Sequence, residues 1–152
     1  MTLTTAQIGR AGEFFVQYRL LLLGVDSAPM STDSGIDLVA YSPLQNGATT
    51  IQVKTNLKPK PGGGKGKLGL DWWLPDDSPA ELVALVDLSE QRVWIFKLAE
   101  VASLAQQHSS GRHHLYMYVD SSHVPRNADR AVHAHAFQKY LLENRSHELF
   151  GV

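Results

Sequence analysis

The sequence predicts an α/β fold in which helices flank a mixed central β-sheet. A helix-start pattern opens the chain, strand-like apolar runs occupy its middle, and a second helical pattern closes it. Strands bracketed by helices, with a hairpin-like middle, indicate a mixed sheet rather than a doubly wound parallel one. At 152 residues and 43% hydrophobic content, the chain is long enough for one core and too short for two comfortable domains. We therefore expect residues 1–152 to form a single domain.

The first predicted element is a helix that runs from Thr4 to Leu23. Thr4 followed three residues later by Gln7 has the form of a capping box. Apolar side chains then recur at helical spacing at Ile8, Ala11, Phe15, Tyr18 and Leu22. Because Val16 and Leu20 widen this apolar surface, we expect the helix to be covered on more than one side.

Strands and loops follow the first helix. Residues 35–41 predict a central strand with apolar residues on both faces, and residues 50–55 alternate with period two after a turn. Two prolines and three consecutive glycines make residues 58–67 unsuitable for a regular element, so we expect a flexible Lys/Gly-rich loop at about residues 57–69. The remaining predicted elements are strands at residues 81–87 and 92–96, a short helix at 98–107, a strand at 115–119 and an amphipathic helix at about 129–143.

Residues able to do chemistry gather on the two predicted strands. Gln52 and Lys54 stand two positions apart and project to one side, opposite Ile51 and Val53. Asp37 lies on the preceding strand, which the turn folds back beside them. A carboxylate or a lysine among apolar neighbours is costly unless it is paired or bound to a cation. One alternative is a buried ion pair between Asp37 and Lys54, which leaves Gln52 unexplained.

The first helix contributes a second acid, Glu13. Gly9 and Gly12 each cost about 1 kcal/mol relative to alanine inside a helix. We interpret them as permitting close approach of another backbone near Glu13. Because a simple ion pair needs no second acid, convergence of Glu13 on Asp37 would distinguish a functional site from an ion pair.

The order of these segments resembles that of the PD-(D/E)XK nuclease superfamily, most of all its archaeal Holliday-junction-resolvase-like branch. The matching segments are Gly12-Glu13 on a helix, Gly35-Ile36-Asp37-Leu38-Val39 on a strand and Ile51-Gln52-Val53-Lys54 on the next. The resemblance implies a restriction-endonuclease-like fold, a homodimer and a divalent ion, Mg²⁺ or Mn²⁺. It also implies hydrolysis of phosphodiester bonds in DNA, with branched DNA as one candidate substrate.

The same resemblance implies roles for four residues. Glu13 and Asp37 would be metal ligands, Gln52 would occupy the third ligand position, and Lys54 would be the motif lysine. A divalent ion offsets charge on the scissile phosphate and lowers the pKa of bound water, while a lysine stabilises developing negative charge or orients the water. Gln52 departs from the pattern, where glutamate or aspartate is common. Its carbonyl oxygen can coordinate a hard cation but brings no charge, so metal should bind more weakly.

The charge distribution adds a candidate nucleic-acid contact. The net charge is −1, yet residues 54–67 hold five lysines and no acid. Lysines that neutralise phosphates release condensed counterions, so such a strip suits local phosphate contact. The candidate nucleic-acid-binding residues outside the motif are Lys58, Lys60, Lys65 and Lys67. The alternative is a solvated lysine loop.

Several function classes are excluded or disfavoured. The absence of cysteine excludes a disulfide framework, a zinc ribbon and a thiol nucleophile. With no long apolar run and no signal-peptide pattern, we expect a soluble cytoplasmic protein. Residues 61–68 fail as a phosphate-binding P-loop, because Pro61 replaces the leading glycine and no serine or threonine follows Lys67.

Histidines and tryptophans receive structural interpretations. His113 and His114 should point to opposite sides of a strand, and His133 and His135 should lie about 200° apart on a helix. We therefore favour surface or packing roles over metal binding. Trp72-Trp73 could stack on unpaired bases, although packing is the favoured interpretation.

The leading hypothesis is a metal-dependent DNA endonuclease, with RNA not excluded as a substrate. The first alternative is a catalytically decayed nuclease-fold module that binds nucleic acid or a protein partner, with Gln52 marking the decay. The second is a globular protein in which Asp37 and Lys54 form only an ion pair.

Overall fold

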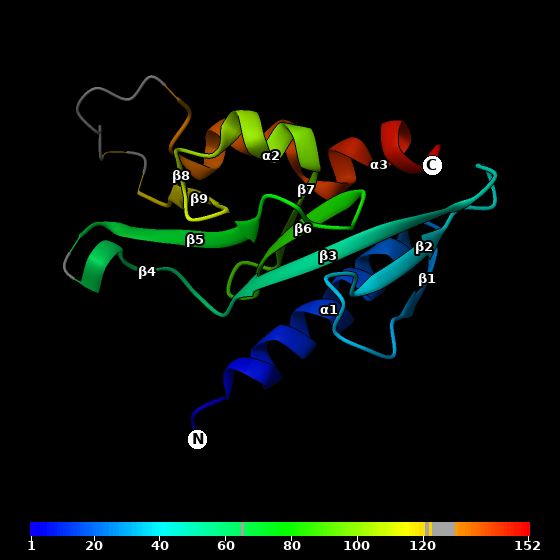
Figure 1. The fold of residues 1–152 in the computed structure, drawn as a ribbon, viewed down its shortest axis with the longest axis horizontal. Coiled ribbons are helices and arrows are strands. Elements are labelled where there is room, and N and C mark those ends of the chain that lie inside the picture. Colours follow the sequence, from blue (N-terminus) through cyan, green and yellow to red (C-terminus); the bar gives the residue numbers. More distant parts are fainter. Residues whose placement is uncertain (65, 121, 123–129) are drawn as a thin grey trace.

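The computed structural model describes residues 1–64, 66–120, 122 and 130–152 of the chain. Within them, a five-stranded mixed sheet contains, in spatial order, β1 (Asp26–Pro29), β2 (Leu38–Tyr41), β3 (Ala48–Asn56), β6 (Leu82–Asp87) and β7 (Arg92–Lys97) (Figure 1). A four-stranded second sheet contains β4 (Lys60–Pro61), β5 (Leu68–Pro75), β9 (Arg112–Tyr118) and β8 (Gln107–Ser109). The helical elements are α1 (Thr5–Leu22), η1 (Gly62–Gly64), α2 (Leu98–Leu104), η2 (Ala134–Tyr140) and α3 (Leu142–Phe150).

Helix α1 begins with the capping box that the sequence predicts. The Gln7 backbone N–H donates to Thr4 Oγ1 at 3.2 Å, and the Thr4 backbone N–H donates to Gln7 Oε1 at 2.9 Å. Val16 and Leu20 are fully buried against the mixed sheet. The prediction that α1 is covered on more than one side is wrong, because large apolar side chains remain exposed on its outer face. These side chains are Phe14, Tyr18, Leu21 and Leu22.

The strand pairing confirms the predicted mixed sheet, since β3 has one antiparallel and one parallel neighbour. Strands β2 and β3 are antiparallel, with Leu38 opposite Ile51, whereas β3 and β6 are parallel, with Gln52 opposite Val83. Strands β6 and β7 form an antiparallel hairpin. The connection between the parallel strands carries β4 and β5, which start the second sheet.

The mixed sheet separates two apolar cores. On one face, α1 and α3 contribute to the first core, and on the other, α2, η2 and the second sheet contribute to the second core. Ile51 and Val53 of β3 belong to the first core. Gln52 and Lys54 pair with Val83 and Leu85, both in the second core, so the predicted alternation of β3 is confirmed.

Two segments differ from the prediction. The expected loop at residues 58–67 contains β4, which pairs with β5 through Lys60 opposite Gly69, and the 3₁₀ turn η1. The expected helix at 129–143 is instead η2 followed by α3, and residue 129 lies outside the described residues. Leu141 separates the two with an extended backbone (φ −57°, ψ 139°) and forms a bridge to Trp94 of β7, so one helix cannot continue through it.

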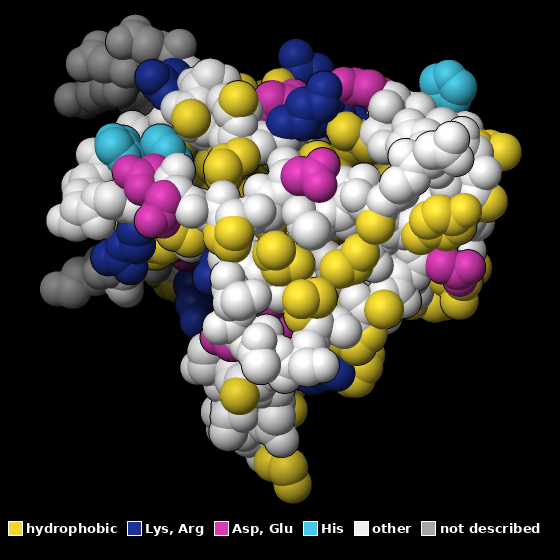
Figure 2. Space-filling model, turned by 45° about the vertical axis from the view of Figure 1, so that its right-hand side comes forward, with side chains coloured by type: hydrophobic (Ala, Val, Ile, Leu, Met, Phe, Trp, Pro, Cys, Tyr) yellow, Lys and Arg dark blue, Asp and Glu magenta, His cyan; other side chains and the backbone are white. Residues whose placement is uncertain are grey.

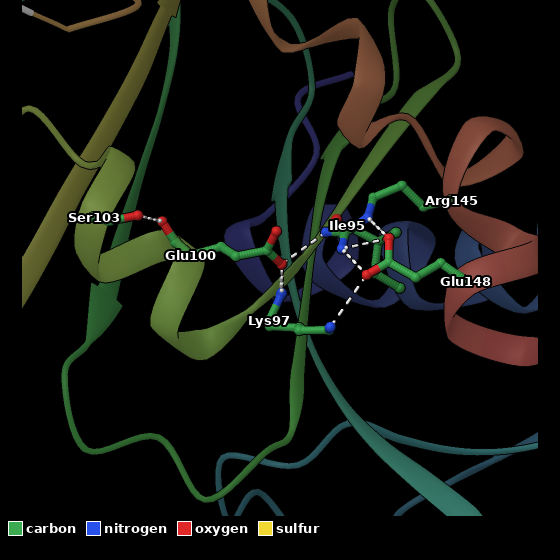
Figure 3. Close-up of polar contacts among 6 residues, drawn as sticks. All are labelled: Ile95, Lys97, Glu100, Ser103, Arg145 and Glu148. Atoms are coloured by element: carbon green, nitrogen blue, oxygen red, sulfur yellow. Dashed lines mark hydrogen bonds and ion pairs between the residues drawn. The ribbon is translucent and has the colours of Figure 1, made fainter.

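Arg145 anchors α3 to the rest of the fold (Figure 3). Its guanidinium is buried and donates to Ile95 O of β7 at 3.1 Å, Glu100 Oε1 of α2 at 2.7 Å and Glu148 Oε2 at 3.0 Å. Burial alone would lower the pKa of Arg145, but the hydrogen bonds to Glu100 and Glu148 outweigh it and raise the pKa above the usual value. Two carboxylates and a backbone carbonyl therefore stabilise the buried Arg145 cation where α2, α3 and β7 meet.

No helix in the described part of the chain is both long enough and apolar enough to cross a bilayer.

Candidate active site

Glu13, Asp37, Gln52 and Lys54, the four residues singled out from the sequence, line one pocket of about 370 Å³. Glu13 comes from α1, Asp37 from the residue before β2, and Gln52 and Lys54 from β3. Residues of the loop between β1 and β2 complete the wall, among them Ser31, Thr32 and Asp33. Segments far apart in the sequence therefore bring two acids, an amide and a lysine around one hollow.

Asp37 lies at the end of the β2–β3 pairing, next to the pair Leu38 and Ile51. It lies directly before β2 rather than within the strand, which corrects the predicted strand start at residue 35. Its backbone N–H donates to Ile51 O at 2.9 Å, and its Oδ2 accepts a hydrogen bond from the Val53 backbone N–H at 2.6 Å. A side-chain oxygen thus takes the place of a strand carbonyl, which fixes the carboxylate beside Gln52 and Lys54.

The electrostatics of the pocket destabilise the charged form of Asp37. Burial is the main cause that raises the pKa of Asp37, and the nearby carboxylates of Glu13 and Asp33 raise it further. The Val53 hydrogen bond and Lys54 act in the opposite direction without cancelling this effect. Several carboxylates that repel one another in one pocket are an arrangement that a bound cation relieves.

Glu13 is positioned by the close contact of α1 with β3. A Cβ atom on Gly12 would overlap the side chain of Thr55, so only glycine lets the helix approach the strand here. A close approach is found at Gly12, although the neighbour is the Thr55 side chain and not the predicted backbone, and the prediction is wrong for Gly9, whose added Cβ would meet nothing within 4 Å. The Glu13 carboxylate, with its side chain 20% exposed, pairs with Arg10 Nη1 at 2.6 Å on the same helix.

Gln52 is engaged by a residue that the sequence gave no reason to select. Its side chain is 5% exposed, and Oε1 accepts a hydrogen bond from Ser78 Oγ at 2.9 Å. Ser78 Oγ also accepts from the Ala80 backbone N–H at 3.3 Å. Ser78 lies in an irregular segment between β5 and β6, so only the tertiary fold brings it to β3. An amide oxygen has two lone pairs, so this contact leaves one acceptor position.

Lys54 has no hydrogen bond or ion pair to another described residue, and none of the ion pairs within 4.0 Å includes it. It acts on Asp37 only through the longer-range attraction that lowers the carboxyl pKa. The alternative of a buried Asp37–Lys54 ion pair is therefore wrong in this structure. Lys54 is left as a half-buried cation on the wall of an acidic pocket.

The donor set suits a hard divalent cation, because carboxylate and amide oxygens are the ligands that Mg²⁺ and Mn²⁺ prefer. Glu13, Asp37 and Gln52, whose side chains carry such oxygens, all line the pocket. Among the described residues, no three histidine or acidic side chains are already arranged to hold one ion. The Glu13 carboxylate is instead paired with the Arg10 guanidinium on its own helix.

Three of the four predicted nucleic-acid-binding lysines, Lys58, Lys60 and Lys67, line two further hollows. Lys54, Lys58 and Lys60 line a neighbouring groove of about 930 Å³, which shares Asp33 and Lys54 with the site pocket. Lys60 and Lys67 line a further pocket of about 380 Å³ on the second sheet. Lys65 lies outside the described residues.

No protein-family model matches this chain, and no curated protein matches it either. Solved structures do match. The bacterial homing endonuclease I-Ssp6803I is similar over 99% of this chain and 94% of its own, with a TM-score of 0.63 and 14% identity. The Holliday junction resolvase Hjc of Archaeoglobus fulgidus is similar over 75% of this chain and 84% of its own, with a TM-score of 0.49 and 17% identity. The chain therefore shares the fold of I-Ssp6803I, and in this chain that fold contains a mixed sheet flanked by helices.

Proposed function

We propose that this protein is a metal-dependent endonuclease that hydrolyses phosphodiester bonds of DNA. The observation that carries the proposal is the convergence of Glu13, Asp37 and Lys54, from three separate elements, on one pocket of a nuclease fold. A structural ion pair would need neither Glu13 nor an unpaired Lys54. The fold similarity to a homing endonuclease supports DNA as the substrate.

In this proposal, Glu13, Asp37 and Gln52 hold Mg²⁺ or Mn²⁺. When bound, such an ion offsets negative charge on the scissile phosphate and lowers the pKa of a water molecule. The Val53 N–H orients the Asp37 carboxylate, and Gly12 allows Glu13 to approach it. Arg10 contacts only Oε2 of Glu13, so it would compete with the ion for that oxygen.

Lys54 supplies the positive charge that the reaction requires beside the metal. Since it is unpaired among the described residues, it can approach a phosphate oxygen without breaking an existing ion pair. A fixed cation at developing negative charge acts most strongly in the transition state. We assign to Lys54 stabilisation of that charge or orientation of the attacking water.

Lys58, Lys60, Lys65 and Lys67 would bind backbone phosphates next to the site, without reading bases. Replacing all four with alanine should weaken duplex binding and reduce its salt dependence, because fewer counterions are released. Lys97→Ala with Lys139→Ala is a control on exposed lysines elsewhere. An unchanged salt slope in the fourfold variant would make this segment a solvated loop without a role in binding.

The alternative is a decayed nuclease-fold module that binds nucleic acid or a protein partner. Gln52 favours it, because its amide oxygen already accepts from Ser78 and it adds no charge to the pocket. The same fold could then present the lysines without cutting.

Metal-dependent nicking separates the two functions. Supercoiled plasmid, branched duplex and single-stranded DNA are each incubated with Mg²⁺, Mn²⁺ or chelator. We expect cleavage that requires the ion, is abolished by Asp37→Ala and falls by about 10²–10³-fold in Lys54→Ala. Asp26→Ala and Lys139→Ala, exposed on β1 and η2, serve as matched controls. Cleavage that persists in Asp37→Ala would come from a contaminant and remove the support for the site.

We also propose that the active form is a homodimer, because cutting both strands of a duplex requires two sites. Sedimentation equilibrium of the wild-type protein tests this. A mass of one chain at concentrations where both strands are cut would refute it.

A further inference from the structure

The outer face of the second sheet carries a run of aromatic rings. Leu70, Trp72, Leu74, Leu115 and Met117 point into the second core. The alternate positions of β5 and β9 therefore lie on the opposite face, where Asp71 pairs with Tyr116 and Trp73 with His114. A solvent-side sheet face is normally polar, so aromatic side chains at three alternate positions of β9 call for an explanation. These positions are His114, Tyr116 and Tyr118.

The rings follow one another along β9 at contact distance. Ring centroids are 5.6 Å apart between His114 and Tyr116 and 5.5 Å apart between Tyr116 and Tyr118. His114 is fixed on both sides of its ring, with Nε2 2.9 Å from Asp71 Oδ2 and Nδ1 3.2 Å from Gln107 Oε1. The first ring of the run is thus held in place.

Trp73 supports this run from one end rather than forming its open face. Its ring stacks on His114 with centroids 4.1 Å apart and planes 3° from parallel. Arg112 lies over the same ring, 4.9 Å from its centroid. Trp72 is buried in the core and cannot stack on a base. The candidates for base stacking are therefore Tyr116 and its neighbours rather than the tryptophans.

His114, Tyr116 and Tyr118 line the pocket of about 380 Å³ on this face, together with Lys60 and Lys67. The wall also contains Asp71, whose Oδ2 lies 2.9 Å from His114 Nε2. In Figure 2, histidine and acidic side chains gather beside basic ones on the left of the molecule, the end that carries the second sheet. Rings flanked by lysines are complementary to a base and its phosphate.

A groove that shares lining residues with both hollows lies between this pocket and the candidate active site. Lys60 lines both this pocket and the groove of about 930 Å³. That groove in turn shares Asp33, Val53 and Lys54 with the pocket that contains Asp37. A strand that followed the lysines from the active site would reach the aromatic rings.

We propose that this pocket binds an unpaired nucleotide of a nucleic-acid strand, whose base stacks on Tyr116 while Lys60 and Lys67 contact its phosphates. Bases inside an intact duplex are stacked on one another and cannot enter, so the pocket would select substrates with a single-stranded segment. The path to the cleavage site rests on the proposed endonuclease function, whereas the binding itself does not.

Binding of an oligothymidine of about 12 nucleotides, measured by fluorescence anisotropy in chelator, tests this without any cleavage. Tyr116→Ala should weaken single-strand binding by about tenfold or more, since removing a stacking ring costs that much per base. Tyr116→Phe should retain the wild-type affinity for the single strand. Tyr116→Ala should bind duplex DNA as tightly as wild type does. Tyr41→Ala, an exposed tyrosine on β2, is the matched control.

Tyr116→Ala should remain folded, because Gln106 holds the backbone of residue 116 on both sides, at 3.0 Å through its N–H and 2.8 Å through its carbonyl. Equal single-strand affinity in wild type and Tyr116→Ala would overturn the proposal, as would equal losses for single strand and duplex. Thymidine monophosphate that competes as strongly as the oligonucleotide would indicate a site for free nucleotides instead. Absence of oligonucleotide binding by the wild-type protein would also overturn the proposal, and a protein partner would then be the next candidate for this face.

The outcome for cleavage is separate. If wild type cuts no DNA but Tyr116→Ala loses single-strand binding, the nucleotide pocket stands and the endonuclease function fails. If plasmid nicking depends on Asp37 while Tyr116→Ala binds as wild type does, the endonuclease stands and the pocket fails.

Discussion

The Asp37 carboxylate accepts a 2.6 Å hydrogen bond from the backbone N–H of Val53. Since β2 begins only at Leu38, this contact continues the β2–β3 pairing by one residue through a side chain. The carboxylate is therefore fixed by the backbone of the strand that carries Gln52 and Lys54. A loop aspartate without this bond could turn away from the pocket.

Neutralising Asp37 should stabilise the metal-free protein at neutral pH. Burial, Glu13 and Asp33 raise the pKa of Asp37 above its ordinary 3.8 despite the Val53 bond and Lys54. The folded state thus holds this proton more tightly than the unfolded state, and the free energy of unfolding falls as pH rises above 3.8 through the raised value. In chelator at pH 7, Asp37→Asn should melt at a higher temperature than wild type, because its amide oxygen can still accept from Val53.

The stability difference should vanish below pH 3.8, where the carboxyl is protonated in both states. Asp26→Asn at an exposed position of β1 is the control. A lower melting temperature for Asp37→Asn at neutral pH would show that the charged carboxylate stabilises the fold, contrary to this expectation.

Arg10 should compete with a metal ion for Glu13. The two side chains form an ion pair at 2.6 Å, but the Arg10 side chain is 47% exposed, so the pair contributes little to stability. Arg10→Ala should tighten Mn²⁺ binding roughly two- to fivefold, the range that loss of a surface ion pair of about 0.5–1 kcal/mol allows. Calorimetric titration measures this, with Arg112→Ala as the control. Weaker Mn²⁺ binding in Arg10→Ala would show that Arg10 positions Glu13 instead of competing for it.

Arg145 should contribute much more to stability than the surface lysine that shares its partner. Arg145→Ala removes a buried cation with contacts to β7, α2 and α3 and should lower the free energy of unfolding by about 2 kcal/mol or more. Lys97→Ala removes only an exposed contact to Glu148 and should cost below about 1 kcal/mol. Urea unfolding of both variants provides the comparison, and equal costs would contradict the assigned role of Arg145.

The first helix and the motif strands could be predicted because their signals are local. The capping box of Thr4 and Gln7 and the alternation of Ile51, Gln52, Val53 and Lys54 depend on neighbours a few residues away. The motif order then pointed to the fold that the comparison with I-Ssp6803I shows. Strand β5 also has a local signal, since Leu70, Trp72 and Leu74 alternate with exposed residues, but the adjacent glycines and prolines obscured it.

Other features depend on tertiary contacts that no local pattern contains. Strand β1 is short and largely exposed, so it lacks an apolar alternation. Ser78 reaches Gln52 only because a long connection returns to β6. His133 and His135, expected to diverge on a helix, stack with centroids 5.3 Å apart, because His133 has an extended backbone before η2. Asp33 was missed because it stands in a polar loop with no periodicity.

Gln52 is the residue at which catalysis and decay diverge. It is buried, its Oε1 accepts from Ser78 Oγ at 2.9 Å, and it lines the pocket with Glu13 and Asp37. Gln52→Glu keeps an acceptor for Ser78 and adds an anion, so Mg²⁺ should bind at least tenfold more tightly, about 1.4 kcal/mol. Cleavage should be preserved or raised, whereas the metal-free variant should melt at a lower temperature because it buries another carboxylate beside Asp37. Calorimetry measures the ion affinity, and Gln138→Glu on η2 is the matched control. If neither wild type nor Gln52→Glu binds a divalent ion or cuts DNA, yet both retain duplex, the binding-module alternative is the better account.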